Sequence, residues 1–276
     1  MRTTPEVGGT RELAVTGPGP PLSEPRPMLS TVAMVSAALL SLAGAGLQPP
    51  ADSTLAEADR LHAEATRKDR ALASTREEVR LLDRALASDG GSYELLWRSA
   101  RALVELGAHL EGGERRDSFE RAIQPGRRAV AARPDRVEGH YWLAAAYGRD
   151  AETHGGLKAF LLARRLRGEM EAVVRLQPGY QDGDAFLALG ELDRALPGWL
   201  GGDRARGRRN LEQGLRVAPG NRELKLELAR AYLDEGRTAE ARRLLETLAS
   251  PAGDAAVDEG VARQARELLS RATTPR

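Results

Sequence analysis

The sequence contains no cysteine, only three lysines and few aromatic side chains. Without cysteine the chain cannot form disulfide bonds, cysteine-ligated zinc sites or iron–sulfur clusters, and it cannot use thiol catalysis. Basic and acidic residues nearly balance, at 41 against 40. This balance argues against a dedicated nucleic-acid binder, which needs a basic surplus. Aromatic residues make up 4% of the chain, and their scarcity beside abundant Ala, Leu, Arg and Glu favours helices.

The first fifty residues differ in character from the rest. Residues 1–27 have no apolar periodicity, which indicates a disordered leader or a start codon placed too early. Residues 28–47 have an apolar centre and end in the small-x-small pattern that signal peptidase prefers, at residues 43–45. We favour a cleaved signal peptide over an uncleaved membrane anchor, because serines and glycines interrupt the apolar run. Both interpretations predict export, either into the periplasm or anchored facing it.

Residues 52–276 carry apolar side chains at helical spacing and are expected to form one folded domain. The pattern predicts one helix from Ser53 to about Ala87, a second over 93–110, a loop at 111–117 and then a third helix. No second apolar stretch as long as the first follows, so membrane contact is expected only through the N-terminal segment. From the third helix onward, a proline follows each amphipathic segment: Pro134, Pro178, Pro219 and Pro251.

The spacing of these prolines is typical of helix-hairpin repeats, whose apolar faces are buried only by stacking. The clearest repeat is 222–248, where six residues follow the tetratricopeptide (TPR) spacing: Leu228, Ala229, Tyr232, Gly236, Ala241 and Leu245. Looser copies precede it, with insertions expected at 149–158 and 196–203. We therefore predict an all-α fold, an irregular TPR-like helix-hairpin solenoid that ends in a terminal capping helix.

Several segments resemble a known family in content and order. They are YELLWRSARAL (93–103), HYWLAAAYG (140–148), GGLKAF (155–160), QPGYQDGDAFLALG (177–190) and LPGWLGGD (196–203). This series is similar to the TRAP-transporter T-component (TatT-like) proteins, and the regulator of microtubule dynamics proteins share a weaker version of it. The resemblance covers about residues 85–270. It implies an exported bacterial helical protein that forms a homotrimer. It also implies that the protein works together with a periplasmic solute-binding protein and handles apolar ligands.

The chain departs from that family at one informative place. Its members are typically lipoproteins, and Leu42-Ala43-Gly44 is the kind of sequence that precedes a lipidated cysteine. The next residue here is Ala45. Lipidation at this position is therefore excluded, and cleavage or a hydrophobic anchor must take its place.

Candidate catalytic and metal-binding residues are few. The four histidines form no HExxH motif, and the predicted all-helical chain offers no strand for a nucleotide-binding loop. We expect His140 to be a packed, hydrogen-bonded core residue, and Asp182 and Asp184 to cap the helix that follows them. An enzyme would need these three residues to cluster. We predict no catalytic site, no metal and no cofactor.

Aromatic residues are the best candidates for a binding surface. Tyr141 and Trp142 are adjacent on one helix, so we expect one to pack in the core and the other to line a groove or interface. Trp199 lies in a Pro-Gly/Gly-Gly loop and either folds back onto the array or contacts a partner. The candidate ligand- or partner-binding residues are Trp97, His140, Tyr141, Trp142, Tyr147, Lys158 and Trp199.

The sequence therefore predicts an exported, non-enzymatic protein that binds a periplasmic solute-binding protein or another envelope protein. A small apolar ligand is a further expectation, and nucleic acid is not expected. The alternative is an assembly scaffold of the cell envelope with no transport role. The arginine runs at 164–167 and 204–209 are solvated helix faces or contacts for an acidic partner.

Overall fold

A computed structural model describes residues 53–67, 71–89, 91–249 and 256–273. The leader expected at residues 1–27 and the signal peptide or anchor expected at residues 28–47 lie outside these ranges. Within them, no helix combines the length and the apolar character that crossing a bilayer requires.

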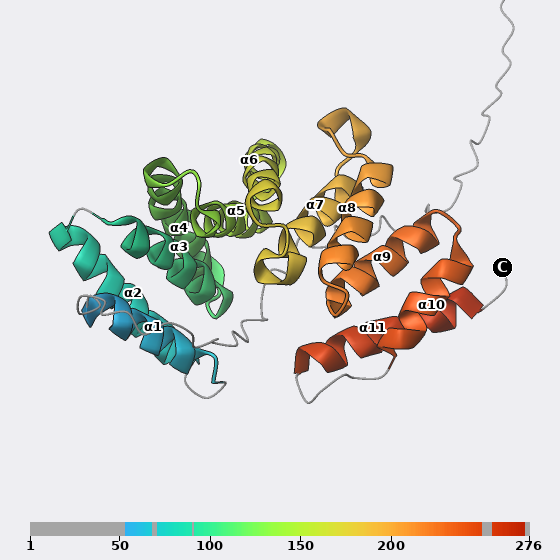
Figure 1. The fold of residues 1–276 in the computed structure, drawn as a ribbon, viewed down its shortest axis with the longest axis horizontal. Coiled ribbons are helices and arrows are strands. Elements are labelled where there is room, and N and C mark those ends of the chain that lie inside the picture. The colour runs from blue at the N-terminus through green and yellow to red at the C-terminus, as the bar shows by residue number, and fades with distance from the viewer. Residues whose placement is uncertain (1–52, 68–70, 90, 250–255, 274–276) are drawn as a thin grey trace, which may run out of the picture.

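The described residues form eleven α-helices and no strand, so the predicted all-α TPR-like solenoid is confirmed. Consecutive helices pair into hairpins that stack side by side into an arch, with α1 and α2 at one end and α10 and α11 at the other (Figure 1). The helices are α1 (Ser53–Ala65), α2 (Ala71–Asp89), α3 (Tyr93–Ala108), α4 (Gly112–Ala132), α5 (Val137–Glu152), α6 (Gly156–Leu176), α7 (Asp184–Ala195), α8 (Arg204–Val217), α9 (Arg222–Asp234), α10 (Thr238–Leu248) and α11 (Ala256–Thr273), with short 3₁₀ turns η1 (Tyr180–Gly183) and η2 (Gly198–Leu200).

Local sequence signals set several of the helix ends. The side chains of Ser92, Asp203 and Asn221 accept hydrogen bonds from backbone N–H groups in the first turns of α3, α8 and α9. Each of these caps satisfies donors that have no partner within the helix. Helices α4, α6 and α8 end shortly before a proline, as predicted. Gly236 makes the tight α9–α10 turn with a φ of +75°, a value that favours glycine.

Two predicted boundaries are wrong. The single helix expected from Ser53 to Ala87 is two helices, α1 and α2, packed against each other as a hairpin. Its break falls in a polar stretch without glycine or proline, so no local signal marked it. The loop expected at 111–117 is almost entirely helical, because α4 begins at Gly112 and extends across that stretch.

The core is continuous from α1 to α7 and has α5 at its centre. Every residue of α5 except Glu138 and Glu152 is buried, because α3, α4 and α6 all pack against it. Smaller clusters continue the core through α8 and α9 and through α9, α10 and α11. At the α7–α8 contact a Cβ on Gly190 would lie 2.5 Å from Cγ of Leu211, so glycine permits this close approach.

Candidate functional site

The aromatic residues of α5 are internal. Tyr141 and Trp142 are both buried, so the expectation that one of them lines a groove is wrong. The reason is that α5 is enclosed by other helices, which leaves neither side of it facing solvent. The Tyr141 hydroxyl donates a hydrogen bond to Oδ2 of Asp184 at 2.9 Å, and its ring meets those of Trp142 and Tyr180 edge-on. Burial raises the pKa of Asp184 to about 6.

His140 is a buried, hydrogen-bonded residue that joins α5 to α6. Its Nδ1 lies 2.6 Å from Oε2 of Glu169, and its Nε2 lies 3.0 Å from the carbonyl oxygen of Pro134. Both ring nitrogens thus face acceptors, and the hydrogen bond to Glu169 raises the pKa of His140. The residue pairs with Glu169 and not with Asp182 or Asp184. Neither aspartate side chain caps α7, whose N-cap is Gly183.

Tyr147 and Lys158 also make contacts between helices. The hydroxyl of buried Tyr147 accepts a hydrogen bond from Nε of Arg127 on α4 at 2.8 Å. The Lys158 ammonium, near the start of α6, donates to Nε2 of His154 at 2.9 Å and lies 3.6 Å from Oδ2 of buried Asp150. These contacts link α4, α5 and α6 to one another.

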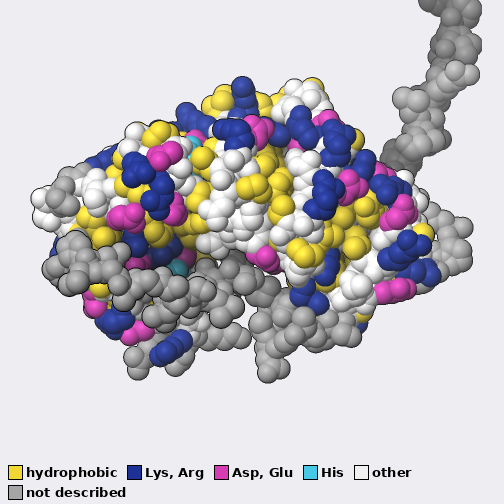
Figure 2. All heavy atoms as spheres, in the orientation of Figure 1, with side chains coloured by type: hydrophobic (Ala, Val, Ile, Leu, Met, Phe, Trp, Pro, Cys, Tyr) yellow, Lys and Arg dark blue, Asp and Glu magenta, His cyan; other side chains and the backbone are white. Residues whose placement is uncertain are grey.

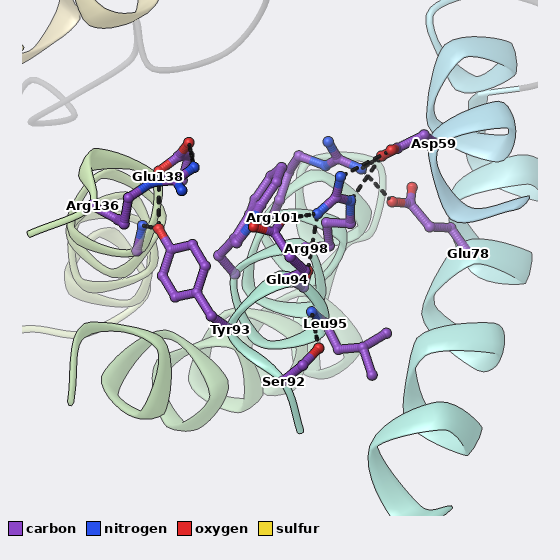
Figure 3. Close-up of polar contacts among 12 residues, drawn as sticks. Asp59, Glu78, Ser92, Tyr93, Glu94, Leu95, Arg98, Arg101, Arg136 and Glu138 are labelled. Carbon is purple, nitrogen blue, oxygen red and sulfur yellow. Dashed lines mark hydrogen bonds and ion pairs between the residues drawn. The ribbon is translucent and has the colours of Figure 1, made fainter. Parts of the chain in front are cut away.

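Trp97 lies on α3 beside two arginines. Its Nε1 donates to Glu94, and the guanidinium groups of Arg98 and Arg101 lie 4.3 and 5.2 Å from the centre of its ring. Figure 3 shows how these arginines reach from α3 toward Asp59 on α1 and Glu78 on α2. Trp97 is therefore half-buried within a network that holds the first three helices together.

Trp199 is the most exposed of the candidates. It is 83% exposed, so the alternative that it folds back onto the array is wrong, and the alternative that it contacts a partner stays a prediction. It lies in η2, on the segment 196–203 between α7 and α8, which we name the Trp199 loop. Of the other six candidates, Lys158 is exposed on α6 and the remaining five are buried or half-buried, and the structure therefore does not gather all seven into one site.

The Trp199 loop is fixed to the array by hydrogen bonds. Within it, the N–H groups of Leu200 and Gly202 donate to the carbonyl of Pro197. The Asp203 N–H donates to the carbonyl of Asp193, and the Arg206 guanidinium donates to the carbonyl of Gly201 at 2.7 Å. A Cβ on Gly202 would lie 1.8 Å from the Leu196 carbonyl oxygen, so the loop closes this tightly only with glycine there.

Asp193 is the residue beneath this loop, and no sequence motif pointed to it. Its carboxylate is fully buried and is contacted from two neighbouring helices. Arg167 on α6 approaches Oδ1 at 2.6 Å, and Arg206 on α8 donates to Oδ2 at 2.8 Å. Asn210 adds a longer hydrogen bond of 3.3 Å. The α6–α7–α8 junction and the Trp199 loop thus share one buried ionic anchor.

Exposed apolar side chains are concentrated in the same part of the array. Besides Trp199, large apolar side chains are exposed on α6 (Leu157, Leu161 and Leu176) and at the end of α8 (Val217). The exposed arginines Arg164, Arg165, Arg204 and Arg209 lie on the same two helices. In Figure 2, apolar and basic side chains alternate across the α6–α8 region of the drawn face. A hollow of about 480 Å³ adjoins the loop and includes Arg194, Pro197 and Arg204 in its lining.

A second group of charges lies where α7 meets α9. Burial, together with the nearby carboxylates of Asp184, Glu191 and Glu227, raises the pKa of Glu223 to about 8. Four acidic side chains of α7 and α9 therefore interact electrostatically at this junction.

Comparison with known families identifies two regions of the chain. Residues 54–191 match the family described as regulator of microtubule dynamics protein 1-3. The chain belongs to this family. Residues 200–263 match the tetratricopeptide repeat. No protein with a curated description matches the chain in sequence.

Solved structures place this member of the regulator of microtubule dynamics family among TPR folds. The thermophilic TPR protein TTC0263 of Thermus thermophilus superposes with a TM-score of 0.54 at 21% identity, over 79% of this chain and 98% of its own. MamA residues 41 to the end, from Desulfovibrio magneticus RS-1, gives a TM-score of 0.45 at 16% identity, over 79% of this chain and 98% of its own. Yeast Tom70 gives 0.34 at 13% identity, over 85% of this chain and 66% of its own. The first of these similarities shows the fold.

The two matched regions leave a short gap between them. The family match ends at Glu191 and the repeat match begins at Leu200, so residues 192–199 belong to neither. This gap contains Asp193, which anchors the junction, and Trp199, which is the most exposed large apolar side chain of the described residues. The most accessible candidate residue thus lies between the two recognised repeat regions.

Proposed function

We propose that this protein is a non-enzymatic protein-binding module whose partner docks on the Trp199 loop and the exposed N-terminal half of α6. The observation that carries the proposal is the exposure of Trp199, at 83%, on a loop that hydrogen bonds hold in place. The fold supports it, because TPR-like arrays are built to present large binding surfaces.

The physical argument concerns the cost of leaving an indole ring in water. A large apolar side chain in a fixed loop orders water around it and gains nothing within the chain. Tryptophan is among the residues that most often dominate binding energies, each such residue contributing about 2 kcal/mol or more. Because the loop is already ordered, a partner loses little conformational entropy in binding it.

The surroundings of Trp199 indicate the chemistry of the partner. Leu157 and Leu161 are one turn apart on α6 and are exposed as well, and exposed arginines lie on α6 and α8. A complementary surface has an apolar pocket for the indole and a rim of carboxylates for the arginines.

The hollows of the array favour a protein partner over a small apolar molecule. The hollow beside the Trp199 loop includes two arginines in its lining. A second hollow, between α9 and α11, is lined by charged groups that include Arg230, Asp234, Glu267 and Arg271. Linings so rich in charge suit a polar protein surface better than an apolar ligand.

We further propose that the chain acts outside the cytoplasm, as the apolar segment at 28–47 suggests. The resemblance to the TRAP-transporter T-component supplies a first partner to test, a periplasmic solute-binding protein, and a homotrimer as the expected assembly. Sequencing the N-terminus of the mature protein tests export and cleavage together. An envelope scaffold would bind through the same surface, but its partner would be an assembly protein.

The decisive experiment is photo-crosslinking from position 199 in the full chain, followed by identification of the captured protein. Affinity for the purified partner is then measured for W199A and for L176A. Leu176 is a matched control, because it is also an exposed apolar residue but lies at the far end of α6. We expect W199A to weaken binding about tenfold or more and L176A to leave it unchanged. Equal affinities for the two variants would refute the proposed surface.

A further inference from the structure

A separate cluster of potential metal ligands lies between the first three helices. His62 on α1, Glu78 on α2 and Glu105 on α3 each place one ligand atom within 4.8 Å of the other two. Nδ1 of His62 lies 3.1 Å from Oε2 of Glu105. Since the three residues come from three helices, the packing of the helices brings them together, and no local motif does.

Glu78 supplies an independent observation. Its side chain is completely buried, and Oε2 has no hydrogen-bond partner within the part of the chain that the structure describes. Burying a carboxylate oxygen without a partner is costly, because the lost contacts with water are not replaced. The other oxygen, Oε1, accepts a hydrogen bond from Arg101 at 2.8 Å (Figure 3). The carboxylate is thus held on one side and unsatisfied on the other.

We propose that His62, Glu78 and Glu105 bind one divalent transition-metal ion, for which Zn²⁺ is the best match. An imidazole nitrogen with two carboxylate oxygens is a zinc donor set, whereas Mg²⁺ and Ca²⁺ prefer oxygen ligands alone. Three atoms no more than 4.8 Å apart can all lie within about 2.8 Å of one ion, so side-chain movements of less than about 1 Å bring them to the roughly 2.0–2.2 Å of zinc bonds. A water molecule completes a tetrahedron.

The charges around the cluster fit this assignment. Glu78 and Glu105 provide two negative charges, and bound Zn²⁺ neutralises both. The guanidinium group of Arg101 is the nearest cation, and Glu78 is not its sole contact. Its Nη2 also lies 3.7 Å from Oδ1 of Asp59, and the group faces the ring of Trp97. Arg101 can therefore hold Oε1 of Glu78 while Oε2 turns to the metal, an arrangement in which a hydrogen bond orients a ligating carboxylate.

The consequence is a structural site that joins three helices. His62 and Glu105 are partly exposed, which gives the ion a route from solvent, while Glu78 forms the buried floor. A bound ion would link the terminal hairpin α1–α2 to α3 and stabilise the folded chain. This assignment departs from the expectation of no metal that the sequence alone suggested.

The test is calorimetric titration of Zn²⁺ into the full chain after treatment with a chelator. We expect one equivalent to bind, with affinity weakened about tenfold or more in H62A and in E105Q. The control is H109A, which removes a histidine of α3's C-terminal cap that lies outside the cluster and leaves the same histidine count as H62A.

Thermal unfolding provides the second readout. Zn²⁺ should raise the melting temperature of the unmodified chain and of H109A, and should raise it less in H62A and E105Q. E105Q keeps the shape of the side chain, so it still tests metal binding if H62A fails to fold. The proposal is overturned if the unmodified chain binds no Zn²⁺, or if H109A loses as much affinity as H62A and E105Q.

Discussion

The helices α1–α7 and the helices α8–α11 achieve the same stacked architecture by different means. In the first region, polar side chains bond across helices far apart in sequence, as Tyr93 does with Glu138 and Tyr141 does with Asp184. In the second region, buried apolar residues at TPR spacing, such as Leu228, Ala241 and Leu245, provide the contact between helices. The polar contact of Tyr232 with Glu212 there involves half-buried groups. Helices α4 and α6 have 21 residues each, against 13 and 11 in α9 and α10.

The difference indicates which interactions fix the arrangement of the helices in each region. A directional hydrogen bond between buried groups is satisfied in one arrangement only, so it fixes the angle between two helices. Contacts between small apolar residues tolerate substitution more readily, provided that volume is conserved. The first region is therefore sensitive to the loss of single polar atoms, and the second is sensitive mainly to changes in size.

The largest effect is expected where the two regions meet. D193A removes a fully buried carboxylate and leaves Arg167 and Arg206 without their shared partner. Breaking a buried ion pair from one side costs about 3–5 kcal/mol, and chemical denaturation monitored by circular dichroism measures this loss. The control D234A removes a half-exposed carboxylate from Arg194 and should cost less than about 1 kcal/mol. A similar loss of stability in both variants would mean that Asp193 does not anchor the junction.

Two tyrosine substitutions sharpen the comparison between regions. Y141F removes one buried hydroxyl from the first region and leaves Asp184 without its donor, at a cost of about 1–3 kcal/mol. Y232F makes the same change in the second region, where the half-buried hydroxyl donates to Glu212 at 3.1 Å, and should cost less than about 1 kcal/mol. Both losses are measured by urea denaturation at one pH. Equal losses would mean that the regions do not differ in this way.

The smallest effect is a pH dependence centred on Glu223. Burial raises its pKa to about 8 from 4.5, so the folded chain holds this proton more tightly than the unfolded chain does. The associated stability is fully present below about pH 4.5 and is lost as the pH rises toward 8. E223Q should reduce this decline in the free energy of unfolding by on the order of 1 kcal/mol, after allowance for screening.

The measurement for this prediction is the free energy of unfolding at several pH values between about 5 and 8. E240Q serves as the control, because the exposed Glu240 carboxylate has a lowered pKa and titrates below this window. An unchanged slope in E223Q would assign the pH dependence to other groups, such as the half-buried Glu152, whose pKa is raised to about 7.

The helical architecture was predictable because its signals are local. Capping residues such as Asn221 and stops such as Pro178 act on their own neighbours, and the apolar spacing at 222–248 repeats a known pattern. The break between α1 and α2 was not predictable in this way, since it lies in a polar stretch and shows only in the packing of α1 against α2. Pro125 shows the converse, because it lies inside α4 without ending that helix.

The candidate site was predictable only in part. The aromatic content of α5 was visible, but its burial on all sides depends on three neighbouring helices. Trp199 was identified from its loop, whereas its exposure is a property of the folded array. Asp193 looked like any helical aspartate, because the arginines that make it an anchor, Arg167 and Arg206, lie on other helices and far from it in sequence.

The attachment of the Trp199 loop has a mechanical consequence. Hydrogen bonds from Arg206 on α8 reach both the loop and Asp193, and Arg167 on α6 reaches Asp193 as well. A partner bound to the loop, as proposed, would therefore contact a segment that is tied to both α6 and α8. The angle between these helices contributes to the curvature of the arch, because the two recognised repeat regions meet there (Figure 1). Such a partner would thus couple the bending of the two regions.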